Sequence, residues 1–221
     1  MRLFARMVLV LWGMPKTLVF NFRYLPFGQA IRLPILVSHR VAFFDLEGTV
    51  TLRCPARTGT VLLGFGGNGA FDFRRARSVW QITGDVIFEG PARLGHGFKL
   101  SVGGCVTFGS DFVLSAESQI VCHDRIQFGR GCLVSFDVLI LDSDFHPIIY
   151  DDRTNSRLHA PIVLGDRVWI GARSTILKGV ELADDVIVAA GAMVVRTERA
   201  HNVLLGGNPA RVLRTGVRWA H

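Results

Sequence analysis

The chain has 221 residues, of which 49% are hydrophobic and 19% charged, so it can bury one sizeable core without a second domain. A formal net charge of +7 suits an anionic partner, but no basic run is interleaved with aromatic residues, and nucleic-acid binding is not expected. The cysteines show neither CxxC pairing nor close spacing, which excludes a zinc site or disulfide scaffold and predicts reduced, mostly buried thiols in the cytoplasm.

Residues 1–40 are expected to form an N-terminal arm that begins with a short helix. The segment MRLFARMVLVLWGMPK places basic residues before an apolar run, as a signal peptide does, but no small-residue cleavage site follows it. The apolar run is also too short to span a bilayer. We expect the arm to pack on the domain or on a neighbouring subunit, with shallow docking at the inner face of the membrane as the alternative.

Residues 41–197 are expected to form one domain, because a period of six residues organises most of this range. Residues two positions apart share one face of a strand, so each hexad predicts a short strand followed by a polar turn. Residues 41–85 look β-rich as well, although the stretch GFGGNGAF interrupts the register. The inward aliphatic residues of the downstream hexads are Leu164, Ile170, Ile176, Leu182, Val188 and Val194.

The same period continues upstream in triplets of hexads, with two extra residues between one triplet and the next. Two of these triplets are Phe108, Leu114, Ile120 and Phe128, Val134, Ile140. The residues after the inward positions sort into three columns, two of them small, so three hexads make one coil of a three-sided prism. Parallel strands stacked in this way form an all-β fold, but the period alone does not determine the hand of the coil.

Residues 142–160 are expected to leave the prism as a loop. If the hexads continued here, they would place His146 and Asp152 in the core, which cannot accept them. Long loops on rigid scaffolds often carry function. Pro147 biases His146 toward an extended backbone, and histidine is suited to act as a general base near neutral pH.

The segment PIVLGDRVWIGARSTILKGVELADDVIVAAGAMVV, followed by GGNPARVLR, resembles the hexapeptide-repeat acyltransferases, in particular the branch with galactoside, maltose and polysaccharide O-acetyltransferases. This resemblance covers roughly residues 86–214, and the upstream part resembles capsular or lipopolysaccharide acetyltransferases more loosely. It implies a left-handed parallel β-helix with a C-terminal tail over residues 198–221. It also implies a homotrimer that binds acetyl-CoA in a groove between neighbouring subunits.

The resemblance also implies roles for individual residues. The dipeptide His146-Pro147 matches the family's catalytic base, which would deprotonate the acceptor hydroxyl while backbone amides hold the tetrahedral oxyanion. Asp142, Asp144 or a backbone carbonyl would orient the imidazole. Residues implied to contact acetyl-CoA are Trp169 at the thioester, Ala172 and Ala190 along pantetheine, and Arg196, Arg211 and Arg214 at the phosphates.

The acceptor site departs from the small-sugar acetyltransferases, because Ser115 stands where they place an asparagine. Ser115 and Glu117 are candidates for hydrogen bonds to sugar hydroxyls, or simply exposed turn residues. The gamma-type carbonic anhydrases share this prism and bind zinc through three histidines. No metal is expected here, because His123, His146 and His159 lack that spacing.

The expected function is therefore acetyl-CoA-dependent O-acetylation of a sugar hydroxyl in a surface-polysaccharide or lipopolysaccharide precursor. Two alternatives remain at this point. One is transfer of the acetyl group to the nitrogen of an amino sugar. The other is a non-catalytic β-helix that serves assembly or binding.

Overall fold

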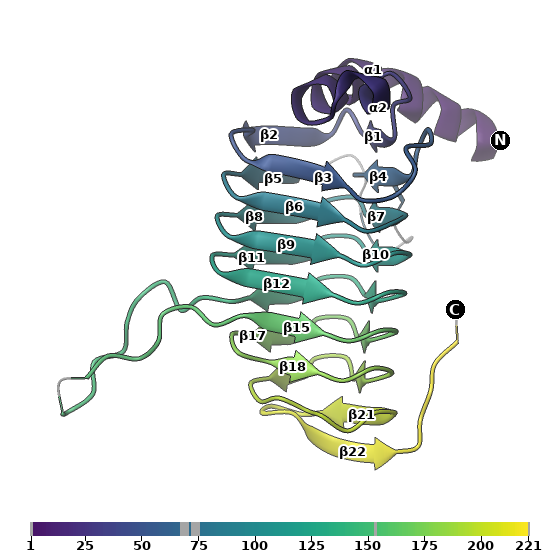
Figure 1. Ribbon diagram of the computed structural model, residues 1–221. Helices are drawn as coiled ribbons and strands as arrows, with labels where there is room; N and C mark the ends of the chain where they lie inside the picture. Colours follow the sequence, from purple (N-terminus) through teal and green to yellow (C-terminus); the bar gives the residue numbers. More distant parts are fainter. Residues whose placement is uncertain (1, 67–70, 72–75, 153, 221) are drawn as a thin grey trace.

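The computed structural model describes residues 2–66, 71, 76–152 and 154–220. The chain forms a three-sided prism of stacked strands with a helix across one end (Figure 1). Half of the stretch that interrupts the predicted register, residues 67–70, lies outside the described residues. The helices are α1 (Arg2–Tyr24) and α2 (Phe27–Ala30).

Three sheets form the sides of the prism, and neighbouring strands within them are parallel except for the last pair, β21 and β22. Sheet A contains, in spatial order, β1 (Ile35–Val37), β4 (Val61–Leu63), β7 (Ala92–Leu94), β10 (Phe112–Leu114), β13 (Leu133–Val134), β16 (Trp169–Ile170), β19 (Ile187–Val188), β21 (Val203–Gly206) and β22 (Arg211–Thr215). Sheet B contains β2 (Val41–Asp45), β5 (Ser78–Ile82), β8 (Lys99–Val102), β11 (Gln119–Cys122), β14 (Leu139–Leu141), β17 (Thr175–Leu177) and β20 (Met193–Val194). Sheet C contains β3 (Thr49–Leu52), β6 (Asp85–Phe88), β9 (Cys105–Phe108), β12 (Arg125–Phe128), β15 (Ile162–Leu164) and β18 (Glu181–Leu182).

The coils wind with a left hand. Each coil passes from sheet A to sheet B to sheet C, as the alternating strand order of the three sheets requires. In Figure 1 the strands of sheet C cross the near side from left to right, the chain then passes behind the prism, and each new coil lies below the last. This winding is the left-handed parallel β-helix that the resemblance implied.

The core of the prism consists of ladders of inward side chains, and the predicted inward residues occupy them. Phe88, Phe108 and Phe128 are paired in register and stack with ring centroids 5.2 and 5.6 Å apart. The ring of Phe112 lies 4.7 Å from those of Phe108 and Phe128. The downstream inward residues predicted from the hexads are also buried: Leu164, Ile170, Ile176, Leu182, Val188 and Val194.

The corners of the prism explain the small residues that follow the inward positions. At the corner between sheets C and A, a Cβ atom added to Gly109 would lie 2.3 Å from the carbonyl oxygen of Gly129 in the next coil. No side chain larger than hydrogen fits there without a shift of the backbone. The two extra residues of each upstream coil lie at the corner between sheets B and C, which we call the BC corner.

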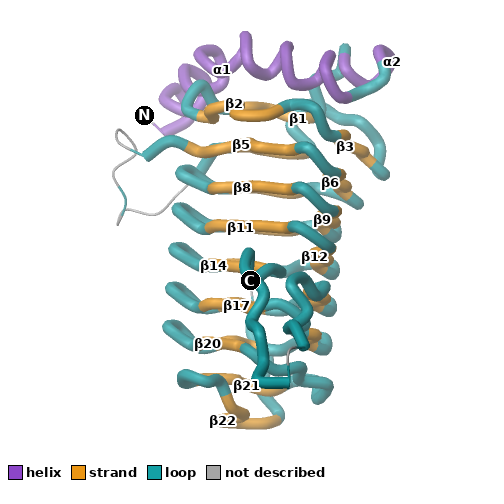
Figure 2. Tube along the Cα trace, turned by 90° about the vertical axis from the view of Figure 1, so that its left-hand side faces the viewer, coloured by secondary structure: helices purple, strands orange, loops and turns teal. Residues whose placement is uncertain are grey.

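Helix α1 covers the first coil, as Figure 2 shows from the side of sheet B. The edge of β1 would otherwise expose unpaired backbone groups. Asn21 instead donates to the carbonyl of Ile35 (2.7 Å) and accepts from its N–H (3.2 Å), while Thr17 accepts from the N–H of Val37 (2.9 Å). Phe20 is fully buried against Trp80, with ring centroids 4.9 Å apart.

The N-terminal arm and the C-terminal tail that the sequence predicts both contain strands. Strand β1 begins at Ile35, inside the range 1–40 expected for the N-terminal arm. In the range 198–221 expected for the tail, β21 pairs in parallel with β19, and β22 then turns back antiparallel. Among the described residues, no helix has the length and apolar run needed to cross a membrane.

The four cysteines are free, and they are buried or half-buried, as the sequence predicts. Burial, with a smaller effect of the Asp142 carboxylate, raises the pKa of the Cys122 thiol far above its usual value, and burial raises that of Cys132 to about 12. Only the thiolate reacts rapidly with thiol reagents. We therefore expect both residues to stay unlabelled near neutral pH until denaturant is added. Labelling of Cys132 in the folded protein, followed by mass spectrometry, would contradict this expectation.

Candidate active site

The segment predicted to leave the prism is an ordered antiparallel ribbon (residues 142–152 and 154–160). From here on we call this ribbon the arm, and it is distinct from the N-terminal arm expected over residues 1–40. It leaves the BC corner between β14 and β15 and extends away from the prism (Figure 1). Its two sides are joined by backbone hydrogen bonds from Ala160 to Asp142 (3.0 Å), Asp144 to Leu158 (3.0 Å) and Ser156 to Ile148 (2.8 Å). The two sides of the arm are therefore held together by pairing along most of their length.

Asp142 anchors the root of the arm. Its side chain is fully buried, and its carboxylate accepts hydrogen bonds from the backbone N–H groups of His123 (2.7 Å) and Asp124 (2.9 Å) in the coil above. Charge-assisted bonds of this kind are among the stronger hydrogen bonds in proteins. The Asp142 carboxylate thus holds the root of the arm to the BC corner.

We expect Asp142→Ala to lower the free energy of unfolding by about 2–4 kcal/mol, because two backbone N–H groups would lose their charged and fully buried acceptor. Chemical denaturation of the variant measures this loss. Asp152→Ala is the matched control: Asp152 is exposed near the tip of the arm, and its side chain accepts hydrogen bonds from Thr154 in the same turn. Equal losses in the two variants would show that Asp142 does not anchor the arm.

A second set of contacts holds the outer part of the root. Asp144 forms an ion pair with Lys178 in the coil below, and Arg157 pairs with Asp124 in the coil above at 3.6 Å. Asp142 and Asp144 thus both bind other groups, and the partner that orients the His146 imidazole, whether one of these carboxylates or a backbone carbonyl, stays a prediction.

His146 is exposed beside the root of the arm, and it directly follows a residue with a left-handed backbone conformation. Phe145 has φ +59°, and its N–H donates to the hydroxyl of the buried Ser143 (2.9 Å). The N–H of His146 donates to the carbonyl of Asp144 at 2.6 Å. With Pro147 following, the backbone on both sides of His146 is constrained, while its imidazole can reach a ligand.

Aromatic contacts fix the neighbours of His146. The ring of Phe145 meets the ring of His123 edge-on, with centroids 5.1 Å apart. The ring of His123 in turn stacks on that of His159, with centroids 5.4 Å apart and an angle of 17°. The sequence did not indicate that His123 and His159, which lie in the coil above and on the other side of the arm, form a cluster with Phe145.

Trp169 lies on sheet A and is half-buried. Its Nε1 donates to the hydroxyl of Ser135 at 3.1 Å, and its ring centroid lies 6.0 Å from that of Trp219 in the C-terminal tail. Trp219 is held in place by a hydrogen bond from its Nε1 to the carbonyl of Arg167 (2.6 Å). Trp169 therefore points out of the prism, as predicted, but the tail covers part of its ring, which the sequence did not indicate.

Four predicted residues share the corner between sheets A and B. Ala172 and Ala190 occupy successive coils there, and the N–H of Gly191 donates to the carbonyl of Ala172 (2.8 Å). Ser115 and Glu117 lie at the same corner two coils above Ala172. Glu117 is half-buried and pairs with Lys99 at 3.6 Å.

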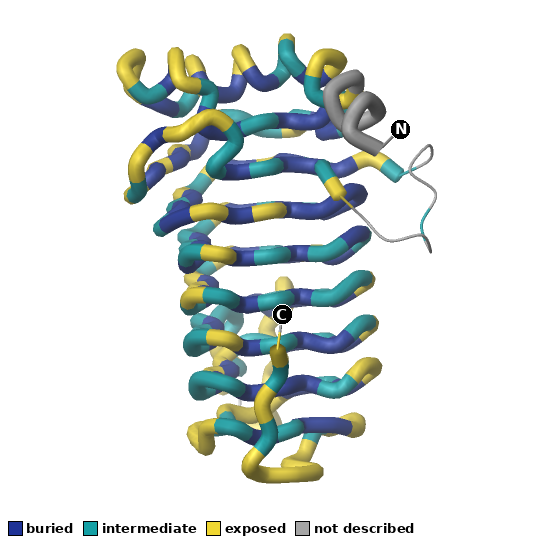
Figure 3. Tube along the Cα trace, turned by 90° about the vertical axis from the view of Figure 1, so that its right-hand side faces the viewer, coloured by how far each residue is buried: buried dark blue, intermediate teal, exposed yellow. Residues whose placement is uncertain are grey.

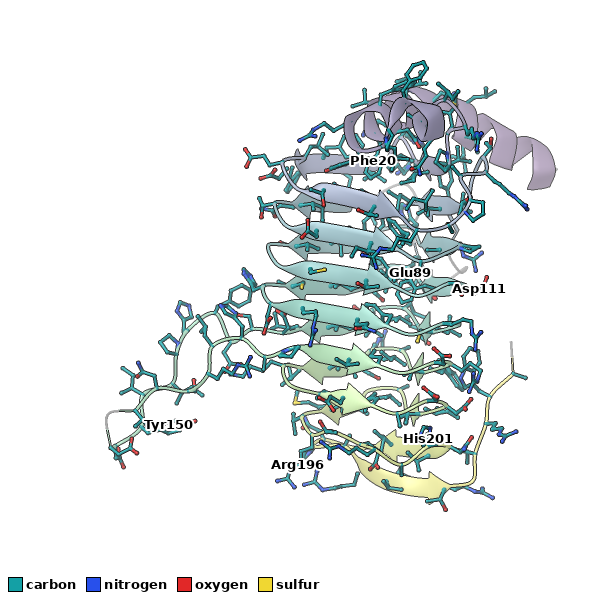
Figure 4. All side chains as sticks on the ribbon, in the orientation of Figure 1. Phe20, Glu89, Asp111, Tyr150, Arg196 and His201 are labelled. Atoms are coloured by element: carbon teal, nitrogen blue, oxygen red, sulfur yellow. The ribbon has the colours of Figure 1, made fainter. Side chains whose placement is uncertain are left out.

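The three predicted arginines are exposed near the C-terminal end of the prism. Arg196 follows β20 and lies on the same side of the prism as the arm, where Figure 4 labels it below Tyr150. Arg211 and Arg214 lie on β22, the last strand of sheet A. Guanidinium groups are suited to bind phosphate groups.

One chain does not bring all the predicted residues together. His146 extends from the BC corner, which is the only corner that sheet A does not touch, whereas Trp169 lies on sheet A itself. A site that contains both residues would need two copies of the chain. Among the described residues, no group of three or more His, Cys, Asp and Glu side chains is arranged to hold a metal ion.

Comparisons with known proteins identify relatives of this fold. The family model "Hexapeptide repeat of succinyl-transferase" matches residues 161–196. Galactoside O-acetyltransferase of Escherichia coli K12 is 30% identical over 115 residues, covering 52% of this chain and 56% of its own length. An uncharacterized 24.8 kDa protein in the cps region of Klebsiella pneumoniae is 32% identical over 203 residues, covering 90% of this chain and 87% of its own.

A solved structure has the same fold. The crystal structure of the polySia-specific acetyltransferase NeuO matches with a TM-score of 0.58 and 19% identity, covering 85% of this chain and 82% of that one. The matches span between 42% and 64% of the length of the first four curated relatives, which include the galactoside enzyme.

Proposed function

The chain belongs to the hexapeptide-repeat acyltransferase family, and from that premise we propose that it transfers the acetyl group of acetyl-CoA to a sugar hydroxyl. The observation that carries this proposal is the arm, which holds an exposed histidine between constrained backbone segments on a rigid prism. The acceptor proposed is a precursor of a surface polysaccharide or lipopolysaccharide. The names of the galactoside and polySia-specific relatives support a sugar acceptor.

In the proposed mechanism, His146 removes the proton of the acceptor hydroxyl as the oxygen attacks the thioester carbonyl. The tetrahedral intermediate carries a negative charge, which backbone N–H groups stabilise. Collapse of this intermediate forms the acetyl ester and releases the thiolate of CoA, which takes the proton from the imidazolium. An imidazole suits both steps, because its ordinary pKa is close to neutral.

The acetyl-CoA site is proposed to lie between two copies of the chain in a homotrimer of parallel prisms. The separation of His146 from sheet A within one chain supports this placement. The arm supports it as well, because it extends into solvent with four exposed apolar or aromatic side chains that a neighbouring copy would cover. These are Phe145, Ile148, Ile149 and Tyr150, which are between 51% and 72% exposed.

The residues at the C-terminal coils fit the parts of acetyl-CoA. Arg196, Arg211 and Arg214 supply cations for its phosphates, and the corner at Ala172 and Ala190 has small side chains that let pantetheine approach the backbone. Ser115 and Glu117 are kept as candidates for the acceptor. Their corner lies away from the BC corner of the same chain, so they too would act on a site completed by a neighbour.

The direct test incubates the protein with acetyl-CoA and a panel of glycosides, and follows release of the CoA thiol and the mass of the product. We expect a singly acetylated glycoside whose acetyl group is lost in mild alkali, because esters are cleaved there and amides are not. An alkali-stable product would favour the N-acetyltransferase alternative. Absence of CoA release with every glycoside would favour a non-catalytic role.

A further inference from the structure

The outward side of α1 has the reverse of the polarity expected for a surface helix. Its inward side holds Gly13, Thr17, Phe20 and Asn21, which are buried against the first coil. A Cβ atom on Gly13 would lie 2.2 Å from the carbonyl oxygen of Val37, so the helix is tightly seated. The outward side of a helix packed this way is normally polar.

Here the outward side is apolar instead, over the part of α1 whose side chains the structure describes. The residues that make up this outer face are between 43% and 73% exposed: Leu11, Trp12, Leu18, Val19, Phe22 and Phe27. The rings of Phe22 and Phe27 lie 6.1 Å apart, which joins α2 to the same surface. Figure 3 shows the exposed outer turns of α1 above its buried inner turns, at the end of the prism. A contiguous exposed apolar surface of this kind marks an interaction site.

The charge of the chain is concentrated in the same region. Residues 1–40 contain six of the 25 lysines and arginines and none of the 18 acidic residues. The other 181 residues are nearly neutral, with 19 basic and 18 acidic residues. Almost all of the net charge of +7 therefore belongs to the segment that carries the outer face.

Individual cations flank the outer face. Arg23 and Arg32 are exposed, and the Arg23 guanidinium lies 5.4 Å from the centre of the Tyr24 ring. Lys16, by contrast, is turned inward, where its ammonium group donates to the carbonyls of His39 and Val41. The cations beside the apolar face are thus arginines that remain available to an anionic partner.

We propose that the outer face docks on the surface of a bilayer that contains anionic lipids, with the prism standing away from the membrane. Apolar side chains at the tip of the molecule enter the region between headgroups and acyl chains, and the surrounding arginines attract the lipid phosphates. The absence of acidic residues from positions 1–40 favours this anionic surface over a second copy of the same face, because two such faces would repel each other. This inference does not depend on the proposed catalytic activity.

The experiment is sedimentation of the full chain with vesicles of phosphatidylcholine alone or of phosphatidylcholine with phosphatidylglycerol. We expect binding to the anionic vesicles that weakens as salt is added, and much weaker binding to the neutral ones. The double variant Leu18→Glu, Phe22→Glu should weaken binding by about 100-fold, because two apolar anchors are lost. The double variant Arg23→Ser, Arg32→Ser should weaken it by about tenfold or more.

Leu213→Glu is the matched control, because Leu213 is 62% exposed on β22 at the other end of the prism. It should bind the vesicles like the unmodified chain. The proposal is overturned if the unmodified chain fails to bind anionic vesicles at low salt, or if the outer-face variants bind as well as it does. It is also overturned if the face instead pairs two copies, seen as a dissociation caused by Leu18→Glu, Phe22→Glu in analytical ultracentrifugation. Acetyl transfer to a soluble glycoside should be unchanged in the two outer-face variants, Leu18→Glu, Phe22→Glu and Arg23→Ser, Arg32→Ser, which separates this test from that of the proposed function.

Discussion

The variant His146→Ala is expected to release CoA from acetyl-CoA and a glycoside about 10²- to 10⁴-fold more slowly than the unmodified chain. This range is the usual contribution of a positioned general base. The fold should survive, because the His146 side chain is exposed and the arm is held by Asp142 and by backbone pairing. The rate is measured by trapping the released thiol, and thermal unfolding of the variant checks that its stability is unchanged.

His201→Ala serves as the control for this experiment. His201 is also exposed, but it lies in the turn before β21, outside the arm. Its removal should leave the rate of acetyl transfer within about twofold. Equal rates for His146→Ala and the unmodified chain would exclude His146 as the base and would require a different residue of the site to take the proton.

Phe108→Ala is expected to produce the largest loss of stability, about 3–5 kcal/mol in the free energy of unfolding. Phe108 is fully buried and stacks between Phe88 and Phe128, so its removal leaves a cavity in the middle of a ladder. Urea denaturation, followed by far-UV circular dichroism, measures the effect.

Phe44→Ala provides the comparison, because Phe44 has the same chemistry but is 65% exposed on β2. Its loss should change the free energy of unfolding by no more than about 0.5 kcal/mol. If the two variants lost similar stability, the stacked phenylalanines would not form the core of the prism.

The sequence predicts the repeating part of this molecule well, because the same local rule operates in every coil. Inward residues such as Leu164 and corner residues such as Gly109 are determined by their position in the hexad, and the structure places both as expected. The arm was also predictable, since His146 and Asp152 cannot occupy core positions. The period did not determine the hand of the coil, which came from the family resemblance.

The contacts within the site could not be predicted, because they join residues that no period relates. The bond from the His123 N–H to the Asp142 carboxylate crosses from one coil to the next at an irregular corner. The stacking of His123 on His159 joins the coil above to the arm, and Trp219 reaches Trp169 from the tail. In each case the path of an irregular segment determines which residues meet, and the hexad repeat does not predict that path.

The two ends of the prism have a consequence for the behaviour of the protein at high concentration. A stack of parallel strands exposes a row of unpaired amides and carbonyls at each end, and such rows can template the addition of further strands. Here Thr17 and Asn21 of α1 satisfy groups of β1 at one end, and β22 reverses direction against β21 at the other. These two closures make growth of the strand stack into fibrils unfavourable. Each stack therefore contains the coils of one chain and does not continue into the coils of another.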